Sequence, residues 1–260
     1  MHRLLISSLL LVGCFTGSAR AEERPAKPIR ALLVIGGCCH DYAHQKDILT
    51  RGISARANVE WTVAYDPDSS THHLNPVYQD AHWAKGYDII VHDECSSDVK
   101  DKEVVDRILQ PHREGLPAVV LHCGMHCYRV SGSDEWFQFT GLTTHSHGAQ
   151  NPIAITYLDK ESPITKGLTD WTTIPEELYR EEKLWASAHP LARGRQGNDD
   201  FVVVWTNRYH KTRVFATTLG HNNQTVADAR YLDLVTNGLL WATGHLTKEG
   251  KPAPGYGPRK

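Results

Sequence analysis

Histidines and cysteines gather behind one apolar segment in the middle of the chain, and these residue types suit metal binding or acid–base catalysis. Residues 118–121 form a short, β-branched apolar run, which is typical of a buried strand in a parallel sheet. His122, Cys123, His126 and Cys127 follow it at once. Ligands of open α/β sheets bind beyond the carboxyl ends of the strands, so this position favours an active site.

Histidine also follows three other segments that we expect to be strands. His40 comes after the first, His92 after the third and His221 after the last. Neutral imidazole is a common ligand for zinc, and catalytic zinc sites use about three protein ligands and one open position. We therefore predict that His40, His122 and His221 hold one divalent metal ion, with zinc as the expected ion.

An acid in the extended stretch 174–180 adds a carboxylate to this set. Glu177 could serve as an oxygen ligand, or as a general base with His122 as its partner. His145 and His147 lie in a loop, where they could chelate an ion or cap the loop. The chain has 16 histidines, and a single strand-end histidine is more often a hydrogen-bonded core residue than a ligand. A purely structural role for these side chains is therefore the alternative.

Five cysteines remain if the N-terminal segment is removed, and an odd number argues against a complete disulfide framework in an exported protein. Each follows an expected strand, so a site-lining role and local disulfides both stay open. Cys123 could act as a nucleophile at a sharp strand-to-helix turn. It lacks the Gly-x-Cys-x-Gly pattern, however, and a buried or disulfide-bonded thiol is the alternative. The five are Cys38, Cys39, Cys95, Cys123 and Cys127.

The composition is that of an ordinary globular protein, with 40% hydrophobic and 22% charged residues among 260. A formal charge of −2 provides no basic field for nucleic acid and no polybasic patch for anionic lipid. We expect a single α/β domain with a small-molecule partner. The composition leaves a homo-oligomer open.

The N-terminus has the pattern of a secretory signal peptide, which we place at residues 1–21. The protein is therefore expected to be exported, to the periplasm or the medium. A sequence before Cys14 also resembles a lipoprotein processing site, which would leave that cysteine acylated. We expect a tether at 22–29, a domain at 30–246 and a flexible tail at 247–260. No later stretch is apolar over the roughly 20 residues that a membrane span requires.

Apolar runs alternate with helical spacing through the first half of the chain, which predicts β-α-β units. Residues 66–85 are polar and rich in proline and histidine, and we expect a long irregular connection there. The expected strands are 31–35, 59–65, 87–91, 118–121, 153–158, 201–206 and 213–219, and the expected helices are 45–57, 98–114, 134–140 and 229–244.

Four motifs in a fixed order resemble the ThuA-like family (trehalose utilisation), a branch of the class I glutamine-amidotransferase-like superfamily. The resemblance covers about Arg30 to Gly244. It implies a flavodoxin-like, doubly wound, mostly parallel sheet with helices on both faces, and that strand order is what would let the three histidines meet. The motifs are Gly36-Gly37-x-x-His40, Leu121-His122-Cys123-Gly124-x-His126, Glu176-Glu177-Leu178-Tyr179 and Leu219-Gly220-His221-Asn222.

The resemblance further implies a role in sugar metabolism, with 3-keto-glycosides derived from disaccharides as the substrate class. We expect an enzyme that hydrolyses, eliminates or isomerises such a keto-sugar, with Glu177, His122 and Tyr179 as catalytic residues. Glutaminase activity is not expected, because the glycines around the cysteine of the amidotransferases are missing. The alternative is a non-catalytic carbohydrate- or metal-binding module. The residues expected to contact substrate are His145, His147, Asn222 and Tyr42.

Overall fold

The computed structural model describes residues 26–259. The predicted signal peptide, Cys14 and residues 22–25 of the predicted tether lie outside the described residues. Within residues 26–259, no helix is both long and apolar enough to cross a membrane.

The fold is built on one nine-stranded sheet, in the order β2-β1-β3-β4-β11-β10-β9-β6-β7. Its strands are β1 (Ile29–Gly37), β2 (Val59–Asp66), β3 (Ile89–Cys95), β4 (Ala118–Leu121), β6 (Asn151–Tyr157), β7 (Trp171–Glu176), β9 (Ala188–Gln196), β10 (Asp199–Tyr209) and β11 (Thr212–Thr217). A separate pair is formed by β5 (Leu142–Thr143) and β8 (Lys183–Leu184). The helices are α1 (Tyr42–Ser54), α2 (Lys102–Glu114), α3 (Glu135–Thr140), α4 (Asn223–Val226) and α5 (Ala229–Thr243), with short 3₁₀ helices at Pro76–Gln79 and His122–His126.

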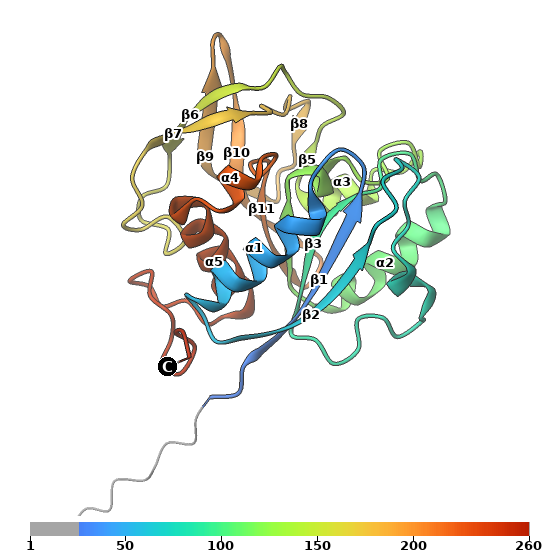
Figure 1. Cartoon of the computed structure of the whole chain (residues 1–260), viewed down its shortest axis with the longest axis horizontal. Coiled ribbons are helices and arrows are strands. Elements are labelled where there is room, and N and C mark those ends of the chain that lie inside the picture. Colours follow the sequence, from blue (N-terminus) through green and yellow to red (C-terminus); the bar gives the residue numbers. More distant parts are fainter. Residues whose placement is uncertain (1–25, 260) are drawn as a thin grey trace, which may run out of the picture.

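The first five strands of this order are parallel and doubly wound. With β11 as the fifth strand, the order is that of flavodoxin, in which the ligand crevice lies at the switch between β1 and β3. The remaining strands continue the sheet through antiparallel pairs, and Figure 1 shows them rising away from the helices. The predicted flavodoxin-like, mostly parallel fold is confirmed.

Helices cover both faces of the parallel half of the sheet (Figure 1). Along β1, Leu33 and Ile35 belong to the core under α1 and α5, whereas Leu32 and Val34 belong to the core under α2 and α3. Successive side chains of a strand point to opposite faces, so a strand covered on both sides is apolar throughout. This explains the continuous apolar run that made β1 recognisable.

Strand β3 differs from the prediction in its length. The sequence predicted an end at residue 91 with His92 delivered to the rim, but the strand continues to Cys95 and His92 is fully buried. Strand alternation turns His92 and Glu94 toward α2, where they contact each other. His112 on α2 is buried in the same place.

Strand β9 was not predicted, because its sequence does not look like a strand. Pro190, Gly194 and several charged residues interrupt any alternation. The strand forms because it lies between β10 and β6 and pairs with both. Tertiary pairing thus overrides weak local propensity here.

The C-terminal segment was expected to be a loose tail and instead folds back onto the domain. The ring of Tyr256 stacks on His245 at 3.5 Å between centroids. The backbone N–H of Asn58 donates to the carbonyl of Tyr256 at 3.0 Å, and Leu246 pairs with Pro252. These contacts give the segment a packed course despite its glycines and prolines.

Candidate active site

Three histidines from separate strand ends converge on one side of the sheet. His40 follows β1, His122 follows β4 and His221 follows β11. One ring nitrogen from each could hold a metal ion, and these nitrogens lie within 4.8 Å of one another. The ring centroid of His40 lies 4.6 Å from that of His122 and 4.8 Å from that of His221. The structure thus brings together the three side chains that the sequence proposed as metal ligands.

His122 occupies a strained turn between β4 and the 3₁₀ helix that follows, with φ of 40°. Its Nδ1–H donates to the carbonyl of Thr218 at 2.6 Å. This bond fixes the tautomer and leaves Nε2 facing Glu177 Oε2 at 3.5 Å and the hydroxyl of Tyr179 at 3.4 Å. Cys123 is disulfide-bonded to Cys95, which is the expected alternative to a nucleophilic Cys123. The residue with the strained backbone at this turn is His122.

Glu177 is buried among the histidines. Its Oε1 lies 3.2 Å from His221 Nδ1, and its Oε2 lies 3.6 Å from His147 Nε2. Burial alone would raise the pKa of this carboxyl, but hydrogen bonds from His122 and His221 and their charges lower it well below its ordinary value. Burial disfavours the charged form of His122, yet its bond to Glu177 and the nearby acids raise its pKa overall. The carboxylate is therefore ionised at neutral pH.

His40 has an unusual environment. Its Nδ1 is buried and has no hydrogen-bond partner within residues 26–259. Burial, followed by the charges of His122 and His221, lowers the pKa of His40 to about 2. Its ring is therefore neutral, which is the form that binds metal ions. Buried polar atoms are rarely left unpaired, so this nitrogen fits a ligand atom.

Glu176 positions the loop that carries His221, and the sequence did not reveal this role. The buried Glu176 accepts the backbone N–H groups of His221 at 2.9 Å and of Asn222 at 3.0 Å. Gly220 allows the tight turn, with φ of 123°, where a Cβ would approach the hydroxyl of Tyr231 to 2.8 Å. Two adjacent acids in a sequence do not show which of them binds backbone and which faces a cavity.

A cavity of about 300 Å³ adjoins the histidines. Arg129 brings a cation to its wall, where its Nη1 donates to the carbonyl of His145 at 2.9 Å. The sequence does not single out this arginine, because nothing in its neighbourhood distinguishes it from a surface charge. The lining comprises Cys38, Cys39, His40, Thr71, Cys95, Ser97, Cys123, His126, Arg129, His145, Ser146, His147, Glu177 and Tyr179.

The residues expected to contact substrate divide into two pairs. His145 and His147 line the cavity, with His145 also held by Glu182 at 2.9 Å. Asn222 does not line it, because its amide donates to the carbonyl of Pro175 at 2.6 Å. Tyr42 is buried behind His40, with 5.4 Å between the ring centroids. The latter two therefore support the site from behind.

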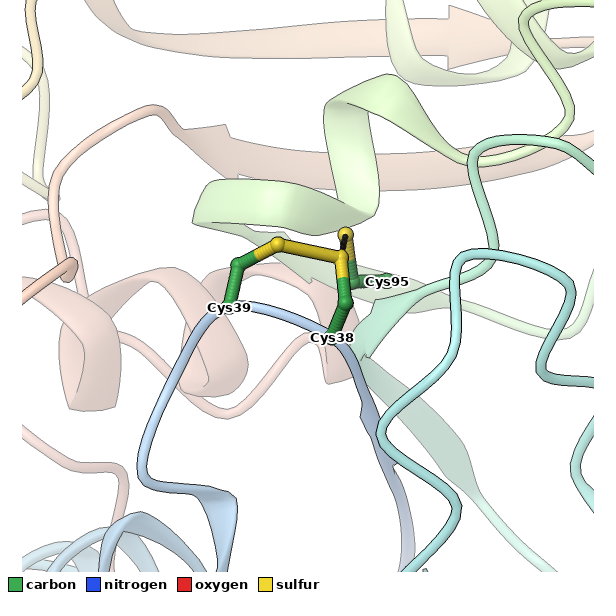
Figure 2. Close-up of side chains that lie close together, drawn as sticks. All are labelled: Cys38, Cys39 and Cys95. Carbon is green, nitrogen blue, oxygen red and sulfur yellow. Dashed lines mark hydrogen bonds between the residues drawn. A yellow bond between two sulfur atoms is a disulfide. The ribbon is translucent and has the colours of Figure 1, made fainter.

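Four of the five cysteines meet at the cavity wall. Cys38 is bonded to Cys39, and Cys95 to Cys123, while Cys127 is free and buried. The sulfur of Cys38 also lies 3.3 Å from that of Cys95 (Figure 2). The local disulfides that the sequence left open are thus present.

A second group of histidines is sealed between β3 and α2. His112 Nδ1–H donates to the carbonyl of Leu116 at 2.8 Å, so its Nε2 must accept from His92 Nε2 at 3.2 Å. His92 Nδ1 is then an acceptor, and Glu94 Oε1 lies 3.0 Å away, in contact with Tyr78 as well. Burial raises the pKa of Glu94 to about 7, consistent with a carboxylic acid that donates its proton to His92.

These features define a flavodoxin-like α/β protein with a histidine and carboxylate pocket beyond its parallel strand ends. The chain belongs to the ThuA family: the family model described as trehalose utilisation matches residues 30–242. That description connects the chain with carbohydrate metabolism.

Solved structures of low sequence identity share the fold. A ThuA-like protein of Parabacteroides merdae is 19% identical with a TM-score of 0.68, over 90% of this chain and 98% of that one. A ThuA-like protein of Bacteroides uniformis is 17% identical with a TM-score of 0.66, over 89% and 98%. The carbohydrate deacetylase Agd3 is 12% identical with a TM-score of 0.51, over 81% of this chain and 33% of its own. No curated protein matches the chain in sequence.

Proposed function

We propose that this protein is an exported enzyme that acts on a keto-sugar, with 3-keto-glycosides as its substrate class. The family description supports a carbohydrate substrate. The cavity of about 300 Å³ is at the small end of the range for small-molecule sites, which suits one sugar ring. Its wall combines an ionised carboxylate, neutral imidazoles and an arginine.

The observation that carries the proposal is the position of Glu177. Its carboxylate lies on the cavity wall and within 3.6 Å of His122, His147 and His221. A carboxylate held in this way can accept a proton from the carbon next to a sugar carbonyl. The same abstraction begins either an elimination or an isomerisation, and a base at this point could also activate water for hydrolysis.

Two neighbours of Glu177 extend its chemistry. Burial, together with the charge of Glu177, raises the pKa of Tyr179 well above its ordinary value. The phenol therefore keeps its proton and can donate a hydrogen bond to a sugar oxygen that gains negative charge. Without a bound metal ion, the raised pKa of His122 favours an imidazolium that stabilises the ionised Glu177, whereas with a metal ion bound the same Nε2 would be a ligand.

The three convergent histidines fit a divalent metal ion. His40 offers an unpaired nitrogen, and the bond from His122 to Thr218 is the type of support that orients metal-binding imidazoles. A zinc ion held by His40, His122 and His221 would supply Lewis acidity, polarising a sugar carbonyl. Glu177 would then accept the proton from carbon, and Tyr179 would donate a hydrogen bond to the sugar oxygen.

Replacing Glu177 by Gln tests the proposal. The amide keeps the shape of the side chain but cannot accept the proton, so turnover of a 3-keto-glycoside should fall by about 10²- to 10⁴-fold. Binding of the same sugar should change far less. The exposed Glu60→Gln serves as the control and should retain full turnover. Unaltered turnover in Glu177→Gln would show that Glu177 is not the base. Sugar binding without turnover in the wild type would favour a non-catalytic binding module.

A further inference from the structure

The two disulfides at the cavity wall lie in contact with each other. Cys38 and Cys39 form one at the end of β1, and Cys95 and Cys123 form the other between the ends of β3 and β4. The sulfurs of Cys38 and Cys95 are 3.3 Å apart, as the dashed line in Figure 2 shows. A thiolate sulfur must come into contact with a disulfide sulfur before it can attack it.

The four cysteines differ in their access to solvent. Cys39 is exposed, whereas Cys38, Cys95 and Cys123 are buried. All four line the cavity, so a molecule of the size of a small dithiol can approach Cys39 from it. The exposed Cys39 is therefore the favoured point of entry for a reductant, and Cys38 is placed to pass the exchange on to the buried disulfide.

We propose that these four cysteines form a thiol–disulfide exchange relay whose substrate is a small external dithiol. One thiolate of the dithiol attacks Cys39, and the bond between Cys39 and Cys38 breaks with Cys38 leaving as thiolate. Cys38 then attacks Cys95, forming a Cys38–Cys95 disulfide and releasing Cys123. The second thiol of the reagent attacks the mixed disulfide and frees Cys39.

The exchange is balanced in electrons and protons. The dithiol loses two electrons and two protons and becomes a cyclic disulfide, while Cys39 and Cys123 each end as a thiol. One protein disulfide remains, and it has moved to Cys38 and Cys95. The product joins the turn that carries His40 covalently to β3, and it leaves a new thiol beside His122 in the cavity.

Alkylation and peptide mapping test the relay without any sugar substrate. The oxidised full chain is treated with one equivalent of dithiothreitol, trapped with a large excess of N-ethylmaleimide and mapped by mass spectrometry. The relay predicts label on Cys39 and Cys123 and a linked peptide pair joining Cys38 and Cys95. Label on Cys38 and Cys39 with the Cys95–Cys123 disulfide intact would overturn it. Four free thiols in the protein as purified would overturn it as well.

The Cys39→Ser variant tests the second step alone. It leaves Cys38 as a free thiol 3.3 Å from Cys95, so the exchange should proceed without reductant and Cys123 should gain a label that the wild type lacks. Label on Cys38 alone would contradict the proposal. Cys127→Ser is the matched control: this thiol is buried and free, and its replacement should leave the labelling of the other four cysteines unchanged.

Discussion

Two histidine groups in this protein contrast in how their ring nitrogens are paired. In the sealed group, the nitrogens of His92 and His112 all have partners, and the chain of bonds runs from the carbonyl of Leu116 to Glu94. The cavity group consists of His40, His122 and His221. In it, His40 Nδ1 has no partner among residues 26–259, and the cavity lies alongside. The sealed group has the bonding of a structural core, and the cavity group has nitrogens left over for a ligand.

The acids of the two groups differ in the same way. Glu94 is fully buried, and burial outweighs the hydrogen bond from Tyr78 and the charge of His73, so the pKa rises to about 7 and the acid keeps its proton. Glu177 is also buried, but hydrogen bonds and charge from His122 and His221 outweigh that effect and lower its pKa. The deeper burial of Glu94 and the histidine partners of Glu177 therefore produce a neutral acid in the core and a carboxylate at the cavity.

The largest expected effect on stability comes from breaking the sealed group. His92→Ala should lower the free energy of unfolding by about 3 kcal/mol, because it opens a cavity in the core, leaves His112 Nε2 without a partner and leaves Glu94 with Tyr78 alone. His221→Ala should lower it by about 1 kcal/mol or less, because this ring lies at the rim of the site. Urea unfolding measures both. Equal losses would show that the two groups do not differ as described.

A smaller effect depends on pH and concerns Glu94. The folded chain holds its proton up to about pH 7, whereas the ordinary pKa is 4.5. The stability that the protonated acid provides is thus fully present below pH 4.5 and is lost as the pH rises through 7. Glu94→Gln removes this loss, so the variant should gain stability relative to wild type over that window, by up to about 1.4 kcal/mol per pH unit.

Unfolding curves of both proteins between pH 4 and pH 8 check this difference, since the other titrating groups are common to both. Glu249→Gln is the control, because Glu249 is exposed and its replacement should give a curve parallel to that of the wild type. A constant offset between Glu94→Gln and wild type would mean that folding does not raise the pKa of Glu94.

The parallel half of the fold could be predicted from the sequence because its strands are buried on both faces. Their runs are continuously apolar, and residues 118–121 match β4 in full. The antiparallel half was harder to recognise, since β9 has few apolar residues and forms through its neighbours. The local sequence pattern therefore identifies a strand reliably only where both faces of the strand are buried.

The convergence of the three histidines was predictable because each follows directly after a parallel strand. His40, His122 and His221 each follow a parallel strand, so the doubly wound order brings them together. The sequence could not show that His92 lies apart from these three histidines, because its location depends on which face of β3 it occupies. The role of Glu176 depends on backbone groups that are distant in the sequence and was likewise out of reach.

The most direct test of the proposed site is the metal content of the protein. Protein purified without a histidine tag should contain about one divalent ion per chain, and His122→Ala should lose most of it. The exposed His189→Ala is the control and should keep the ion. A wild-type protein that is metal-free and fully active, or a His122→Ala variant that retains its ion, would contradict the assignment of His40, His122 and His221 as ligands.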